Sequence, residues 1–169
     1  MQYWDNILYP PFLATIRGEY YGIITQDELD EECYNLACRA ISTFKFPRIS
    51  TEYETFYAVR DVEREILHEV NIEDHPEAIP HGCFINDLTQ SEIAVIVAWM
   101  KAYWCENQLS SSNNFEDVFT DSNIKTYSRA NLVDKTNALW KSYVAQAKEL
   151  ENNYGRVKNF TPTLGDINS

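Results

Sequence analysis

Apolar residues recur at three- and four-residue steps in three long segments of the chain, a spacing that predicts amphipathic helices. The first of these segments, 26 to 44, follows Thr25. With Glu28 three residues later, Thr25 forms a capping-box pattern, so the helix should begin there. Pro47 cannot continue a helix, so this one should end shortly before it. Its apolar stripe consists of Leu29, Cys33, Leu36, Ala37, Ala40, Ile41 and Phe44.

A second helix is predicted over 89–107, because Thr89 and Glu92 repeat the capping-box pattern. Its large residues occupy one broad face: Ile93, Ile96, Val97, Trp99, Met100, Tyr103 and Trp104. Small residues occupy the opposite face: Ala94, Ala98, Ala102 and Cys105. This two-sided pattern is typical of a central helix with one neighbour among the large side chains and another close to its backbone.

The third helix is predicted over 127–154, with Gly155 as a left-handed stop. Its apolar positions follow a heptad-like spacing: Leu132, Thr136, Leu139, Trp140, Tyr143, Val144, Ala147, Leu150 and Tyr154. The residues that follow, 156–169, lack periodicity and predict an extended C-terminal tail, either loose or in contact with a partner.

The middle of the chain, 48–86, follows no helical period. "TEYETFYAV" alternates in part and "HGCFIN" is a second short run, so the two are expected to pair as a small antiparallel hairpin. "RDVEREILHEV" between them fits a helical turn or a strand equally well. The expected fold is therefore mainly α: one helical bundle domain over 1–155, with a β-hairpin insertion at about 48–86 and extended terminal segments.

Length and charge limit the classes of function that this chain can have. A chain of 169 residues with 44% hydrophobic residues can bury the core of one domain. A net charge of -12 repels phosphate, which argues against sequence-specific nucleic-acid binding. The apolar run from Ile93 to Cys105 is shorter than the roughly 20 residues that span a bilayer, so we expect no membrane segment. The N-terminal sequence has no secretion pattern, so we expect reduced thiols and synthesis in a cytoplasm.

Candidate chemistry is sparse. His68, His75, His81 and Cys83 have no standard ligand spacing, so no metal site is expected. The five glycines form no phosphate loop, and neither the serines nor the cysteines lie in a nucleophile pattern. The acidic run 27–32 fits the first turns of a helix, where carboxylates gain from the helix dipole. We therefore expect neither enzyme activity nor a cofactor.

Aromatic residues outside the three stripes are the candidate partner interface, because aromatic side chains bury much area at a modest cost in entropy. These residues are Tyr3, Trp4, Tyr9, Phe12, Tyr20, Tyr21, Phe56, Tyr57 and Phe160. The alternative is that they fold back over the helices of their own chain as satellite clusters.

Residues 84–154 resemble a family of small virion structural proteins of tailed bacteriophages, the neck ring or head-to-tail connector proteins. The matching features are Phe84, Asp87, Leu88, Thr89, Glu92, Ile93, Met100, Trp104, Asp121, Tyr127, Ser128, Ala130, Asn131, Leu132 and Tyr154. The likeness is one of pattern and includes no catalytic signature.

The resemblance implies a subunit of a ring, dodecameric in this family, that joins the portal protein to other neck or tail proteins. Such a ring extends the channel through which DNA passes without being bound by sequence. It implies location in the virion, at the neck or tail, after synthesis in the host cytoplasm. The alternative from another class is a free cytosolic helical adaptor or inhibitor that binds a single host or phage protein.

Overall fold

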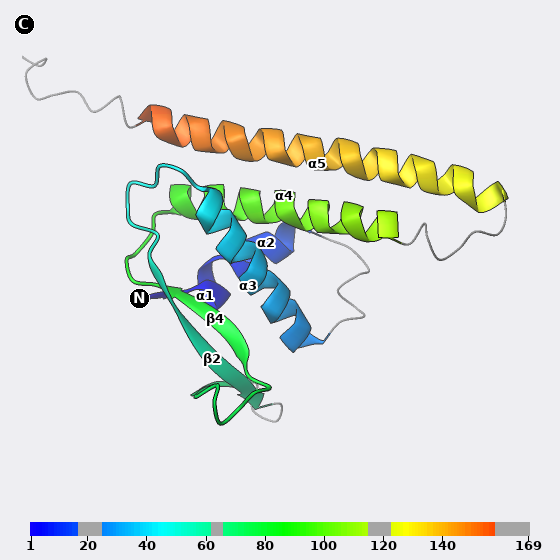
Figure 1. Cartoon of the computed structure of the whole chain (residues 1–169). Helices are drawn as coiled ribbons and strands as arrows, with labels where there is room; N and C mark the ends of the chain where they lie inside the picture. The colour runs from blue at the N-terminus through cyan, green and yellow to red at the C-terminus, as the bar shows by residue number, and fades with distance from the viewer. Residues whose placement is uncertain (17–24, 62–65, 115–122, 158–169) are drawn as a thin grey trace, which may run out of the picture.

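The fold combines helices with a four-stranded antiparallel sheet. The computed structural model describes residues 1–16, 25–61, 66–114 and 123–157, and the structural statements below refer to these residues. The predicted class, a mainly α bundle with a small hairpin insertion, is wrong, because the chain has a mixed α+β fold. The sheet is one layer of the molecule, with helices stacked on it (Figure 1).

The sheet has the strand order β1-β4-β2-β3. Its strands are β1 (Gln2–Tyr3), β2 (Tyr53–Asp61), β3 (Ile66–Val70) and β4 (Ile79–Phe84). The predicted pairing of the two middle runs is confirmed, since β2 pairs antiparallel with β4 from Tyr53 opposite Phe84 to Ala58 opposite Ile79. Residues 66–70, for which helix and strand were both open, form β3 against β2.

Two features hid the full extent of the sheet from the sequence pattern, one at the N-terminus and one in β4. Pro80 and Gly82 lie within this strand, although proline and glycine usually weaken a central strand. A proline is tolerated at position 80 because β1 pairs only with Cys83 and Phe84 of β4. On the β1 side of β4, Pro80 therefore lies at an open edge of the sheet. The sheet also recruits β1 from the N-terminus, and a two-residue strand has no periodicity to detect.

The N-terminal segment forms two short helices, α1 (Trp4–Ile7) and α2 (Tyr9–Thr15), which the sequence analysis did not predict. Prolines in the first turn of α2 suit a helix start, where their missing N–H group costs nothing. The next helix, α3 (Gln26–Thr43), is confirmed together with its Thr25 and Glu28 capping box.

Helices α4 (Gln90–Asn114) and α5 (Asn123–Val157) are both longer than predicted. Helix α5 continues through Gly155, so the predicted stop there is wrong, and two residues of the expected tail belong to the helix. Residues 158–169, the rest of that tail, lie outside the described residues. Helix α4 packs against α2, α3 and α5, which agrees with its predicted central position among the helices.

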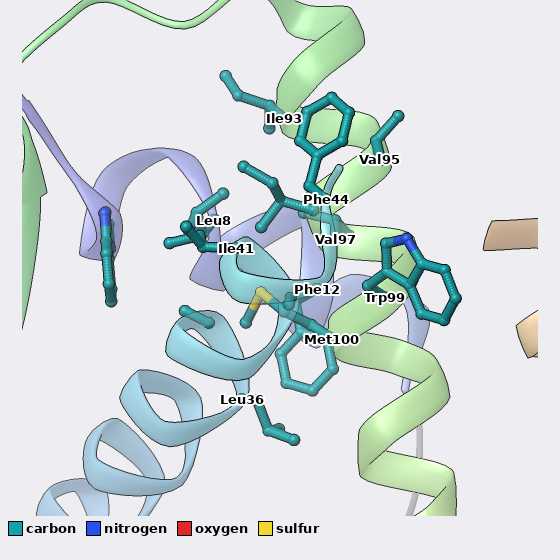
Figure 2. Close-up of a cluster of buried hydrophobic side chains, with 14 of the residues drawn as sticks. Leu8, Phe12, Leu36, Ile41, Phe44, Ile93, Val95, Val97, Trp99 and Met100 are labelled. Atoms are coloured by element: carbon teal, nitrogen blue, oxygen red, sulfur yellow. The ribbon is translucent and has the colours of Figure 1, made fainter. Parts of the chain in front are cut away.

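The core lies between α1, α2, α3 and α4. Figure 2 shows Leu8 and Phe12 meeting Leu36 and Ile41 of α3 and Met100 of α4. The predicted α3 stripe is largely buried, since all of its members except the half-buried Leu29 have at most 7% exposure. On the small-residue face of α4, however, Ala94 is exposed and Ala98 is half-buried, whereas Ala102 and Cys105 are buried.

Gly82 is required by the close approach of Trp4. A Cβ atom at this position would lie 2.4 Å from the Trp4 indole ring, closer than van der Waals contact allows. Gly155, in contrast, has open space around its Cα atom and lies within a helix. We expect Gly82→Ala to lower the free energy of unfolding by about 1–3 kcal/mol. Gly155→Ala, the matched control, should raise it by up to about 1 kcal/mol. Urea unfolding measures both values, and a neutral Gly82→Ala would contradict the packing of Trp4 on β4.

Candidate functional site

The C-terminal end of α5 is fixed to the body by a buried carboxylate, Glu92, near the start of α4. Glu92 is 1% exposed. One of its oxygens accepts hydrogen bonds from the Tyr154 hydroxyl at 2.7 Å and the Ile49 backbone N–H at 3.0 Å. The other accepts from the backbone N–H and hydroxyl of Thr89, at 2.8 and 2.9 Å. A single side chain thus joins α4, α5 and the segment between α3 and β2.

Arg48 extends this network. Its backbone N–H donates to the Tyr154 hydroxyl at 2.7 Å, and its guanidinium donates to the Tyr154 carbonyl oxygen at 2.9 Å. Burial works to raise the pKa of Glu92, but the hydrogen bonds from Tyr154, Thr89 and Ile49 outweigh it and hold the pKa below its usual range. Burial and the neighbouring Glu92 carboxylate raise the pKa of Tyr154. The pair is therefore an anionic carboxylate with a neutral phenol at neutral pH.

A groove of about 700 Å³, here called the C-terminal groove, lies beside this network. Its floor contains the nearly buried rings of Phe44, Trp99 and Tyr154. Three cations line it as well: Lys45, Lys148 and Arg156. Glu151 of α5 connects the parts of the chain that line the groove. It accepts hydrogen bonds from the Trp99 indole N–H at 3.2 Å and the Lys45 backbone N–H at 3.0 Å.

Helix α5 is only partly covered by its own chain. Figure 1 shows it lying along α4 on the outside of the molecule, and α4 is its main packing partner. Among its described side chains, 133–156, only Ala147 and Tyr154 are buried, while Leu139 and Leu150 are 42% and 43% exposed. Over residues 133–156, roughly 36 Å of helix, α5 thus leaves much of its surface open.

The charge of α5 differs in sign from that of the rest of the chain. Six basic and three acidic residues give α5 a net charge of +3. The remaining residues carry eight basic and 23 acidic side chains, a net charge of -15, and the two values together give the total of -12. The subunit therefore carries a partly covered helix with a positive net charge on a strongly acidic body.

The nine aromatic residues predicted to form a partner interface differ in burial and do not form one surface. Trp4, Tyr9 and Phe12 have at most 4% exposure and belong to the core, so they offer no surface to a partner. Tyr3 is 46% exposed and meets the half-buried Phe56 edge to face, with ring centroids 5.7 Å apart. Tyr57, the last of the described aromatic residues in this set, is half-buried and lies next to Phe56 on β2. Three members lie outside the described residues: Tyr20, Tyr21 and Phe160.

The histidines do not come together. His68 and His75 lie beside Asp61 and Glu77, respectively. His81 is fully buried on β4, with Nδ1 3.2 Å from Asp5 and with no hydrogen-bond partner at Nε2 among the described residues. No group of three or more His, Cys, Asp and Glu residues in the described ranges is arranged to hold a metal ion.

Burial raises the pKa of the Cys33 and Cys105 thiols. These thiols are therefore protonated at neutral pH and are weak nucleophiles. Within the described part of the chain, no helix combines the length and hydropathy of a membrane-spanning segment.

Lys45, Phe46 and the basic residues at the end of α5 were not among the residues predicted from the sequence. Phe46 is 72% exposed and lines the C-terminal groove. The available signal was the run "FKFP", in which an aromatic residue lies between the end of a helical stripe and a proline. Its first phenylalanine completes the α3 stripe, which leaves the second with no place in the core.

Comparison of the chain with protein-family models, with curated proteins and with solved structures finds no match in any of the three.

Proposed function

We propose that this chain is a structural subunit of the head-to-tail connector of a tailed bacteriophage, a ring that joins the portal to the tail and extends the DNA channel. The observation that supports this best is the contrast between α5, partly uncovered and with a positive net charge, and the acidic body. A closed ring needs heterologous contacts, in which one surface of each subunit binds a different surface of the next. Opposite net charges on two parts of one subunit provide such a pair.

The acidic body also suits a DNA channel. Outside α5 the chain carries a net charge of -15, which repels the phosphate backbone. A ring lined by such surfaces lets DNA slide without gripping it. The partners proposed are identical subunits around the ring and, along its axis, the portal and other neck or tail proteins.

The test is the composition of the virion. We expect mass spectrometry of purified particles of the encoding phage to find this chain at a fixed ratio to the portal protein. A labelled copy should appear at the neck in reconstructions of the particle. Absence of the chain from particles would overturn the proposal in favour of a free adaptor or inhibitor that binds a single protein.

Assembly in solution gives a second prediction. We expect the isolated subunit to sediment as a folded, weakly associating monomer and to form a ring once portal is added, because a template raises the local concentration of subunits. Sedimentation velocity across a concentration series, with and without portal, measures this. A stable closed ring without portal would contradict the template dependence.

A further inference from the structure

The C-terminal groove gathers three cations that form no ion pair within the described part of the chain. Lys45, Lys148 and Arg156 line the groove, and all three side chains are exposed. The ion pairs between described residues involve other side chains. Glu151, the carboxylate in the groove, already accepts hydrogen bonds from Trp99 and from the Lys45 backbone. In a chain with 26 acidic and 14 basic residues, three unpaired cations in one groove favour an anionic partner from outside.

The turn between β3 and β4, residues 71–77 and here called the acidic turn, offers the opposite charge. Every residue of this turn is exposed. It contains Glu73, Asp74 and Glu77 and no lysine or arginine. Glu77 bonds to His75 at 3.0 Å, whereas the side chains of Glu73 and Asp74 form no ion pair among the described residues. The acidic turn thus presents two adjacent, unpaired carboxylates.

The start of α3 is the other acidic stretch that could be considered. It has five carboxylates within residues 27–32, but three of them are engaged inside the subunit. Glu28 belongs to the capping box, and Asp27 and Asp30 pair with Arg60. The remaining two are adjacent on a helix and point in different directions. The acidic turn is therefore the better match for the groove.

The groove and the acidic turn lie on opposite sides of one subunit. The acidic turn leads into β4 at Ile79, and β4 ends at Phe84, five residues or roughly 17 Å further along the strand. The Phe84 end is the one that leads to Glu92 and its network beside the groove. Figure 1 shows the β3–β4 connection at the end of the sheet that is far from α5. A subunit therefore cannot fill its own groove, and contact between the two features joins one copy to the next.

We propose that the acidic turn of one copy docks into the C-terminal groove of the next copy and forms a head-to-tail contact of the ring. This inference rests on the proposed ring function, because the contact is heterologous and repeats from copy to copy. Glu73 and Asp74 meet the three cations of the groove. Docking also covers Ile72, which is 37% exposed, against Phe46 of the groove. Exposed ion pairs each contribute little, so the contact is weak and suits a ring that forms on a portal template.

Disulfide trapping tests the contact in the full-length chain. One preparation carries Ile72→Cys and the other, with a different affinity tag, carries Asn152→Cys at an exposed position that lines the groove. The two are mixed with oxidised glutathione as the oxidant, and the unmodified chain gives the background rate of the native cysteines.

Mixed dimers of Ile72→Cys and Asn152→Cys should form at least about tenfold faster than with the control partner Ala138→Cys, because docking raises the effective concentration of the two thiols. Ala138 is also exposed on α5, but it lies roughly 21 Å from Asn152 along the helix. Equal rates for the two partners would overturn the proposal.

Charge reversal sharpens the test. Adding Lys148→Glu to the Asn152→Cys copy should slow trapping about tenfold, through repulsion from the carboxylates of the acidic turn. Adding Asp74→Lys to the Ile72→Cys copy as well should restore most of the rate. Lys141→Glu, an equal change at an exposed position of α5 outside the groove, is the control and should have little effect. Equal slowing by both reversals, or no recovery in the compensated pair, would overturn the contact.

The two proposals fail in different ways. If the chain is absent from particles while trapping of Ile72→Cys by Asn152→Cys remains specific, the contact stands without a connector role. If the chain is a stoichiometric part of particles but trapping shows no preference for the groove, the ring closes through other surfaces.

Discussion

Replacing Trp4 with alanine should lower the free energy of unfolding of the isolated subunit by about 3–5 kcal/mol, the range found for loss of a large buried aromatic side chain. Trp4 is fully buried. Its ring contacts Tyr34, Tyr53 and Phe84, with centroids 5.5, 4.8 and 5.5 Å away. This cluster joins α1 to α3 and to the sheet, so the loss affects the contact between the two layers.

Trp4→Ala also distinguishes the two roles considered for the N-terminal aromatic residues, a partner interface and packing within their own chain. An interface anchor would leave the monomer as stable as wild type and impair only assembly. Replacement of a core residue lowers the stability of the monomer itself. Urea unfolding measures this stability at a protein concentration too low for association. Tyr3→Ala is the matched control, because this neighbouring side chain is 46% exposed and should contribute far less. A Trp4→Ala variant of unchanged stability would contradict the burial of this ring.

Trp4 and Gly82 should also be coupled. The clash of Gly82→Ala is with the indole ring, at 2.4 Å, so the same substitution should cost much less when Trp4 is already alanine. A double-mutant cycle gives the coupling free energy. Independent effects of the two changes would show that Gly82 is required for another reason.

The sequence predicted what depended on local chemistry. Thr25 begins α3 because its hydroxyl and the Glu28 carboxylate bond to each other's backbone N–H groups within four residues. The α3 stripe and the antiparallel pairing of β2 with β4 were also predicted from spacing alone. Each of these features can be recognised from residues close together in the sequence.

The full four-stranded extent of the sheet and the N-terminal helices depended on distant contacts and were missed. Strand β2 is mostly half-buried, so apolar and polar residues do not alternate clearly along it. At the N-terminus a four-residue spacing of buried side chains is present at Trp4, Leu8, Phe12 and Ile16. From the sequence alone, Trp4 and Phe12 were assigned to a partner interface, because aromatic residues suit a core and an interface equally well. Only the packing of α1 against β4 distinguishes the two.

The candidate site was the least predictable part. Helix α5 was predicted, but how much of it remains uncovered depends on which helices pack against it. The C-terminal groove combines Lys45, just after α3, with Trp99 of α4 and Glu151 of α5, which lie far apart along the chain. Lys45 and Phe46 become notable only once Phe44 is seen to fill the core and Phe46 is seen to remain outside it.

The second large effect is expected at Glu92. Replacing it with alanine should lower the free energy of unfolding by about 3–5 kcal/mol, because donors on Ile49, Thr89 and the buried Tyr154 lose their shared acceptor. Glu92→Gln keeps the shape and one acceptor oxygen, so it should cost less, about 1–3 kcal/mol. Glu149→Gln, at an exposed position on α5, is the control and should be near neutral. Urea unfolding at neutral pH compares the three.

The pH dependence of the same variants identifies the charge as the cause. The pKa of Glu92 in the folded state lies below the ordinary value of 4.5, so its ionised form contributes stability above that value. This contribution is lost as the pH falls below 4.5 and through the folded-state pKa. The difference in stability between wild type and Glu92→Gln should therefore be largest near neutral pH and shrink as the solution is acidified. Tyr154→Phe should show a coupled loss, since its hydroxyl donates to the same carboxylate. A difference that stayed constant from neutral pH to below 4.5 would show that the Glu92 side chain stabilises α5 by its shape, and that its charge has no part in fixing α5 to the body.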